Sequence, residues 1–146
     1  MDPVLVVVLV GAVLIYLISE DKVLTFEEKT RYAQLTLDYC AQVLFHNLNT
    51  PVPLIQFSIN PNKNYAEYDP STRTITVFEG GTTNKRLLVE VIIHEYTHHV
   101  QYSTRETRQY KELLDQNGYR KHPWEVEARR NASQHARACL ATLRKY

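Results

Sequence analysis

The order of apolar and polar residues divides the chain into an apolar block and a longer mixed segment. Residues 4–18 read VLVVVLVGAVLIYLI without a charge, and with Pro3 and Ser19 the uncharged stretch reaches 17 residues. That length is at the short end of what spans a bilayer. The pattern therefore predicts a membrane anchor over residues 1–20 and one folded domain over residues 21–146.

A cleaved signal peptide is the alternative interpretation of the apolar block. Residues 1–3 supply no positive charge, and no small-x-small cleavage site precedes Glu20, so the pattern favours a retained anchor. The nearest cations all follow the block, at Lys22, Lys29 and Arg31. Their position favours a single-pass N-terminal anchor, inserted through residues 4–18, with the domain on the cytoplasmic side.

The mixed segment opens with a helix and continues with strands. Thr25 followed by Glu28 has the spacing of a capping box, and apolar residues at three- and four-residue intervals predict a helix to about Asn47. Residues 54–59 predict a strand. Residues 65–78 predict a hairpin, because turn residues separate two stretches with strand character.

Three further helices follow the hairpin. One of Thr82, Thr83 or Asn84 caps a helix that continues through His98 to about Tyr102. Residues 105–116 predict a polar helix stopped by Gly118, and Pro123 suits the first turn of the last helix. The order predicts an α+β domain with a small sheet ahead of a mostly helical C-terminal half.

Charge and cysteine content narrow the class of protein. The net charge is +1 with acids and bases interspersed, so no basic stripe indicates a nucleic-acid partner. Cys40 and Cys139 fall in separate predicted helices and fit no close-spaced zinc pattern. Two buried free thiols are the favoured interpretation, and one disulfide between the first and last helices is the alternative.

The sequence His94-Glu95-Tyr96-Thr97-His98 is the strongest chemical signal in the chain. Histidines four residues apart lie on one helix face and can take two corners of a zinc site. Glu95 flanks the metal without sharing the ligand face, where it can accept a proton from a water that Zn²⁺ acidifies. Residues 87–93 before the motif are apolar except for Glu90, and they predict a buried helix that delivers this polar turn into a cleft.

The third ligand must come from outside the motif. The metzincin extension is excluded, because Gln101 and Thr104 stand where it needs Gly and His. Downstream, Glu125-Val126-Glu127-Ala128 opens the last helix. From residue 65 to 132 the chain resembles gluzincin-type zinc peptidases, in which H-E-x-x-H is followed by a Glu on a later helix, often as E-x-x-A.

The resemblance implies a zincin-like fold and a His94, His98, Glu125 zinc site, with a strand edge that pairs with an extended peptide. Glu127 is the alternative ligand, since two residues further along a helix it points roughly the other way. The family's usual acid four residues after the ligand Glu is replaced by Arg129, so the partner of a ligand histidine is left open.

Other polar residues are weaker candidates. Tyr119 and His122 precede Glu125 and are candidate contacts for a developing oxyanion, against ordinary packing or exposure. Gln101 is a candidate cleft residue. On a helix His99 points about 100° away from His98. This direction favours solvent exposure, or contact with a metal-ligating side chain, over direct binding of the metal.

The sequence therefore predicts a membrane-anchored zinc peptidase that acts on peptide or protein substrates, with Glu95 as general base. The alternative is a zincin-fold scaffold protein at a membrane, which keeps the metal site with little or no turnover.

Overall fold

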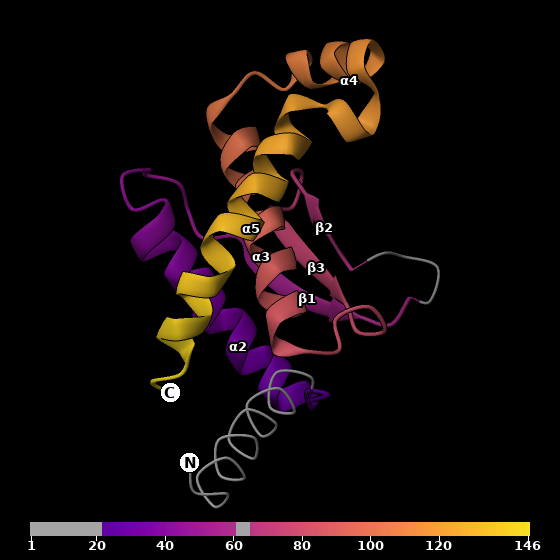
Figure 1. Cartoon of the computed structure of the whole chain (residues 1–146). Helices are drawn as coiled ribbons and strands as arrows, with labels where there is room; N and C mark the ends of the chain where they lie inside the picture. Colours follow the sequence, from indigo (N-terminus) through magenta and orange to yellow (C-terminus); the bar gives the residue numbers. More distant parts are fainter. Residues whose placement is uncertain (1–21, 61–64) are drawn as a thin grey trace, which may run out of the picture.

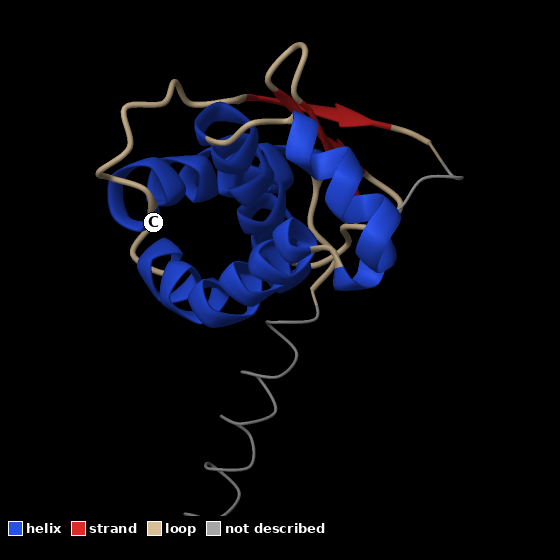
Figure 2. Ribbon diagram, turned by 90° about the horizontal axis from the view of Figure 1, so that it is seen from above, coloured by secondary structure: helices blue, strands red, loops and turns tan. Residues whose placement is uncertain are grey.

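The computed structural model describes residues 22–60 and 65–146, so the predicted anchor at residues 1–20 lies outside the described residues. Within the described part of the chain the domain is α+β, as predicted, with four α-helices and a three-stranded sheet. In Figure 1 the sheet lies to one side of the helices α3 and α5, and Figure 2 shows the strands along one edge of the helical layer. None of the helices described is long and apolar enough to cross a membrane.

The sheet has β3 (Thr74–Phe78) as its central strand. β1 (Leu54–Ser58) pairs with β3 in parallel, and β2 (Ala66–Asp69) pairs with it antiparallel, which confirms the predicted hairpin. Every residue of β3 is buried, as expected of a strand flanked on both sides. β2 is an edge strand, and it contacts α3.

The first helix, α2 (Phe26–Tyr39), begins at the predicted capping box of Thr25 and Glu28. The prediction of a regular helix to about Asn47 is wrong in its last turn. Residues Cys40–Leu44 form a π-helix, η1, in which Phe45 N–H donates to Cys40 C=O at 2.8 Å. The wider turn accompanies the packing of Phe45, which stacks on Tyr96 of α3 with ring centroids 5.5 Å apart.

The helix α3 (Lys85–Thr104) runs through the centre of the domain and packs against α2, β2, β3 and α5. It begins at Asn84, whose side chain accepts from Leu87 N–H at 2.9 Å. The apolar residues of α3 form the core together with one face of α2, the strand β3 and both cysteines. The apolar residues of α3 that are fully buried are Leu88, Val89, Ile92 and Ile93. Cys40 and Cys139 are buried free thiols, which confirms the favoured interpretation.

The last two helices are α4 (Arg108–Lys121) and α5 (Pro123–Leu143). The polar helix predicted over residues 105–116 is shifted, because α3 extends to Thr104 and Arg105 caps it in an extended conformation. Gly118 interrupts α4 with φ 69° and ψ 165°, consistent with its predicted role as a helix stop. Pro123 occupies the first position of α5, as predicted.

Candidate metal centre

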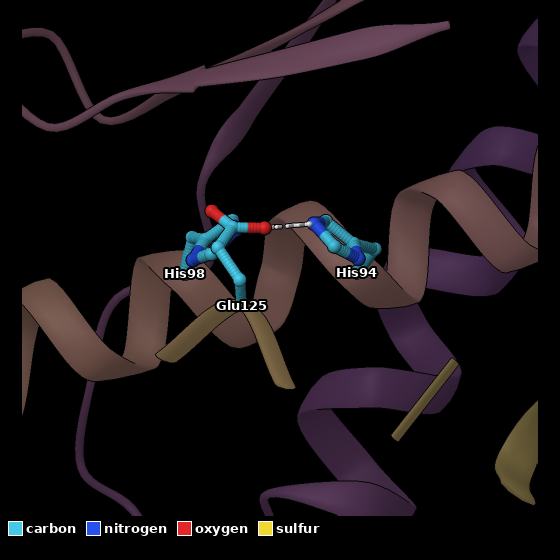
Figure 3. Close-up of side chains that lie close together, drawn as sticks. All are labelled: His94, His98 and Glu125. Atoms are coloured by element: carbon cyan, nitrogen blue, oxygen red, sulfur yellow. Dashed lines mark hydrogen bonds and ion pairs between the residues drawn. The ribbon is translucent and has the colours of Figure 1, made fainter. Parts of the chain in front are cut away.

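Three side chains from two helices converge on one point. Figure 3 shows His94 and His98 projecting from α3 toward Glu125, which comes from α5. His98 Nε2 lies 3.1 Å from His94 Nε2 and 3.1 Å from Glu125 Oε1, and His94 Nε2 lies 3.4 Å from Glu125 Oε2. One ligand atom from each residue lies within 4.8 Å of the others, so the cluster could hold a metal ion.

The local sequence explains why Glu125 reaches the histidines. The His122 side chain caps α5 by accepting from Trp124 N–H at 3.1 Å, and Pro123 occupies the first helical position. Glu125 therefore lies in the first turn of α5, where a carboxylate is also favoured by the helix dipole. Helices α3 and α5 pack against each other, and this contact brings Glu125 to the histidine pair.

The protonation of His98 shows that the cluster suits a cation. Gln101 Oε1 is an acceptor 2.8 Å from His98 Nδ1, so the neutral ring carries its proton on Nδ1 and directs the lone pair of Nε2 to His94 and Glu125. Glu125 Oε2 is buried and receives no hydrogen bond from the residues described. Acceptors facing one another in this way are unfavourable without a positive charge between them.

The spacing of the three ligand groups is also close to that of a site for a small metal ion. Tetrahedral sites with metal–ligand bonds of 2.0–2.1 Å place neighbouring ligand atoms about 3.3 Å apart. The closest distances between the three groups, 3.1, 3.1 and 3.4 Å, are near that value, although His98 and His94 face different oxygens of the Glu125 carboxylate. The residues present therefore fit a site with two imidazoles and one carboxylate.

The electrostatics of the ligands keep the carboxylate ionised. Burial pushes the pKa of Glu125 up, but the adjacent imidazoles of His94 and His98 outweigh burial and hold that pKa well below the usual range. Burial lowers the pKa of His98, yet the carboxylates of Glu125 and Glu95 reverse this and raise it overall. Glu125 is therefore ready to bind a cation at neutral pH.

Glu95 lies beside the cluster without belonging to it. Its side chain is buried, and burial raises the pKa of its carboxyl above the ordinary value, although the nearby His98 and His94 and a hydrogen bond from the Tyr68 backbone lower it. Glu95 and Tyr68 of β2 line the same hollow. Glu95 thus has a raised proton affinity beside the candidate metal.

Two adjoining hollows open around the three ligands. One, of about 540 Å³, includes His94 in its wall, and the other, of about 260 Å³, includes His98 and Glu125. Ala66, Glu95 and Tyr119 line both hollows. The cleft therefore runs between the edge strand β2 and the segment that leads into α5, with the ligands at its floor.

The structure separates the two oxyanion candidates. Tyr119 is 60 % exposed at the cleft, and burial, helped by the Glu125 carboxylate, raises its pKa to about 12. His122 is fully buried, with Nδ1 accepting from Trp124 N–H and Nε2 directed to Tyr110 C=O at 2.9 Å. Both His122 nitrogens are used inside the fold, which leaves only Tyr119 available to a ligand.

His99 is not exposed, so the expectation of solvent contact is wrong. Its Nε2 lies 2.7 Å from Pro51 C=O and therefore donates, which leaves Nδ1 to accept from the Tyr68 hydroxyl at 3.0 Å. Burial lowers the pKa of His99 and keeps the ring neutral. This residue fixes β2 to α3, because Tyr68 belongs to the edge strand that borders the cleft.

Arg129, which stands where the resemblance expects an acid, lines the larger hollow together with His94, but among the described residues it forms no hydrogen bond to either ligand histidine. Its guanidinium donates to the Arg120 backbone carbonyl. Gln101 contacts His98 instead. The sequence predicted Gln101 only as a residue that lines the cleft, and no sequence pattern predicted its contact with His98. The histidine partner left open by the sequence is therefore an amide on α3.

Comparison with known proteins does not assign a family or a function to this chain. The chain matches no protein-family model, no curated protein and no solved structure. Functional inference therefore rests on the chemistry of the site.

Proposed function

We propose that this protein is a zinc-dependent peptidase of the gluzincin type, tethered to a membrane through residues 4–18. The observation behind this proposal is the convergence of His94, His98 and Glu125 in an open cleft with the buried carboxyl of Glu95 beside them. Two imidazoles and one carboxylate are a recurring ligand set of catalytic zinc.

The number of ligands favours catalysis over the scaffold alternative. Structural zinc sites use four protein ligands, whereas catalytic sites use three and keep one position open. Within the described residues the cluster holds three ligands, and two hollows adjoin it. Bound Zn²⁺ would polarise a scissile carbonyl and acidify a water at that open position.

The residues of the chain supply the proton transfers. Glu95 would accept the proton of the attacking water, since its raised pKa favours proton uptake, and pass it to the leaving amine. The Tyr119 hydroxyl stays protonated near neutral pH because its pKa is about 12, so it would act as a hydrogen-bond donor to the developing oxyanion.

The edge of β2 would hold an extended peptide. Phe78 N–H donates to Tyr65 C=O at 2.9 Å, and hydrogen-bonded pairs alternate along an antiparallel ladder. The intervening residue Ala66 therefore turns its N–H and C=O away from β3, and Ala66 lines both hollows. A substrate strand added at this edge would lie directly above the metal ligands.

The test compares full-length wild type with Glu95→Gln and with Glu112→Gln, a matched change at an exposed acid on α4. Zinc content and cleavage of an unfolded, fluorescently labelled protein are both measured. Glu95→Gln should keep one zinc per chain and lose cleavage by about 10²-fold or more, while Glu112→Gln should resemble wild type. Wild type that binds zinc without cleaving any protein substrate would favour the scaffold alternative.

A further inference from the structure

Gln101 connects the two helices that supply the metal ligands. It lies one turn after His98 on α3 and is 1 % exposed. Its Oε1 accepts from His98 Nδ1–H at 2.8 Å, while its Nε2 donates to Trp124 C=O at 3.0 Å and to Glu127 Oε2 at 3.1 Å. All the hydrogen-bonding atoms of this buried amide are therefore engaged.

The orientation of the amide is fixed by its partners on α5. Trp124 C=O and the Glu127 carboxylate only accept hydrogen bonds, so they require the Nε2 end of Gln101. The Oε1 end must then face His98, and it can only accept. Gln101 thereby holds the His98 proton on Nδ1 and leaves Nε2 free for a metal.

The same side chain also fixes the first turn of α5. Trp124 precedes the ligand Glu125 in the chain, so the bond from Gln101 to Trp124 C=O sets the position of Glu125 relative to His98. Glu127 is held in addition by Arg105, at 2.7 Å and 2.9 Å. A continuous series of contacts therefore runs from Arg105 at the protein surface through Glu127 to the Gln101 amide.

We propose that Gln101 is a positioning residue of the metal site, which orients His98 and Glu125 together through one neutral amide. This inference rests on metal binding at the proposed site and does not require that the protein cleave peptides. It assigns to an amide on the motif helix the role that the resemblance gives to an acid at the position of Arg129. Partners of this kind commonly change metal affinity 10- to 100-fold.

The experiment measures zinc affinity of the full-length chain by competition with a chromophoric chelator. Gln101→Ala removes all three hydrogen bonds and should weaken zinc binding about 10- to 100-fold. Gln101→Glu keeps an acceptor for His98 but loses both donors and faces the Glu127 carboxylate, so it should also weaken binding. The double variant Gln101→Glu with Glu127→Gln exchanges amide and carboxylate. It restores the contact between positions 101 and 127 but not the donor to Trp124 C=O, so it should recover part of the lost affinity.

Asn131→Ala is the control for a purely structural role. Asn131 on α5 donates to Thr97 on α3 at 3.3 Å, so it also links the two helices, but it touches no ligand. It should leave the zinc dissociation constant unchanged, even if unfolding of the metal-free protein becomes easier. The visible spectrum of the Co²⁺-substituted protein should change for Gln101→Ala and stay as in wild type for Asn131→Ala.

The outcomes separate this inference from the proposed function. Unchanged zinc affinity in Gln101→Ala would overturn the positioning role, whether or not wild type cleaves peptides. Equal losses in Gln101→Ala and Asn131→Ala, or no recovery in the double variant, would reduce Gln101 to a packing contact. Wild type that binds zinc but cleaves nothing would refute the peptidase and leave the role of Gln101 standing, whereas wild type that binds no zinc would overturn both.

Discussion

Arg105 and Glu127 form an ion pair, with Nη1 2.7 Å from Oε2, that keeps Glu127 away from the ligand histidines. Glu127 also accepts from Gln101, and these donors hold the pKa of its carboxyl below the ordinary value. Glu125, two residues earlier, faces His94 and His98 instead. The two acids of Glu125-Val126-Glu127 therefore have separate roles, one toward the metal and one toward the surface.

Single substitutions of these acids should affect metal content differently. Glu125→Gln removes a ligand, so purified protein should contain much less than one zinc per chain. Glu127→Gln leaves all three ligands in place and should retain zinc, with at most a moderate loss of affinity through its contact with Gln101. Elemental analysis decides the matter. Loss of zinc in Glu127→Gln with retention in Glu125→Gln would mean that the ligands are assigned wrongly.

Gly118 should be required for the position of Tyr119. Its φ of 69° with ψ of 165° strains any residue with a Cβ, so Gly118→Ala should cost about 1–3 kcal/mol of stability. Because Tyr119 follows directly, cleavage should fall about as far as in Tyr119→Phe. Gly80→Ala is the control, since a Cβ there meets nothing within 4 Å. Denaturant midpoints and kcat/KM report the two effects, and equal behaviour of both alanine variants would contradict this explanation.

The domain should lose stability in alkaline solution through its buried thiols. Burial raises the pKa of Cys139 to about 11 and raises that of Cys40 well above 9.0. Between about pH 9 and pH 11 the unfolded chain releases these protons while the folded chain keeps them, so the free energy of unfolding falls as pH rises. Each thiol contributes at most about 1.4 kcal/mol per pH unit in that window.

Urea denaturation of the metal-free protein between about pH 8 and pH 11 measures this slope. Cys139→Ala removes one of the titrating groups, so its stability should fall less steeply with pH than that of wild type. The comparison uses slopes, because the substitution also lowers stability at every pH by leaving a small cavity. Parallel curves for the two proteins would exclude Cys139 as a source of the alkaline loss.

The contact between Tyr68 and His99 should stabilise the edge strand. Tyr68→Phe removes the hydroxyl and leaves His99 Nδ1 buried without its donor, at a cost of about 1–3 kcal/mol. Tyr65→Phe, on the exposed side of the same hairpin, should change stability by less than about 0.5 kcal/mol. Thermal denaturation measures both. If Tyr68→Phe is as stable as Tyr65→Phe, β2 is held to α3 by other contacts.

Features that depend on neighbouring residues could be predicted from the sequence. The capping box of Thr25 and Glu28, the first-turn proline of α5 and the hairpin of β2 and β3 all follow from local chemistry. The spacing of His94 and His98 placed both on one helix face for the same reason. Glu125 could be preferred over Glu127 because it completes the E-x-x-A pattern, although only the packing of α5 against α3 brings it to the histidines.

Features that depend on tertiary packing could not be predicted. The π-helical turn after α2 accompanies the stacking of Phe45 on Tyr96, and the parallel pairing of β1 with β3 joins segments separated by the hairpin. His99 was expected to meet solvent or a metal-ligating side chain because it turns away from His98, but β2 covers that side of α3. The role of Gln101 depends on the distance between α3 and α5, which no spacing along the chain encodes.

The position of the ligands on either side of α4 has a consequence for chain dynamics. α4 joins α3 to α5 and has no buried residue, so it packs on the domain through partly exposed side chains such as Tyr110, which contacts His122 and Trp124. A metal bound to both His98 and Glu125 would cross-link the two ends of the segment that contains α4. This cross-link would lower the conformational entropy of that segment when it unfolds locally. Amide hydrogen exchange in Arg108–Lys121 would then slow on metal loading, and a helix without buried residues would report occupancy of the metal centre.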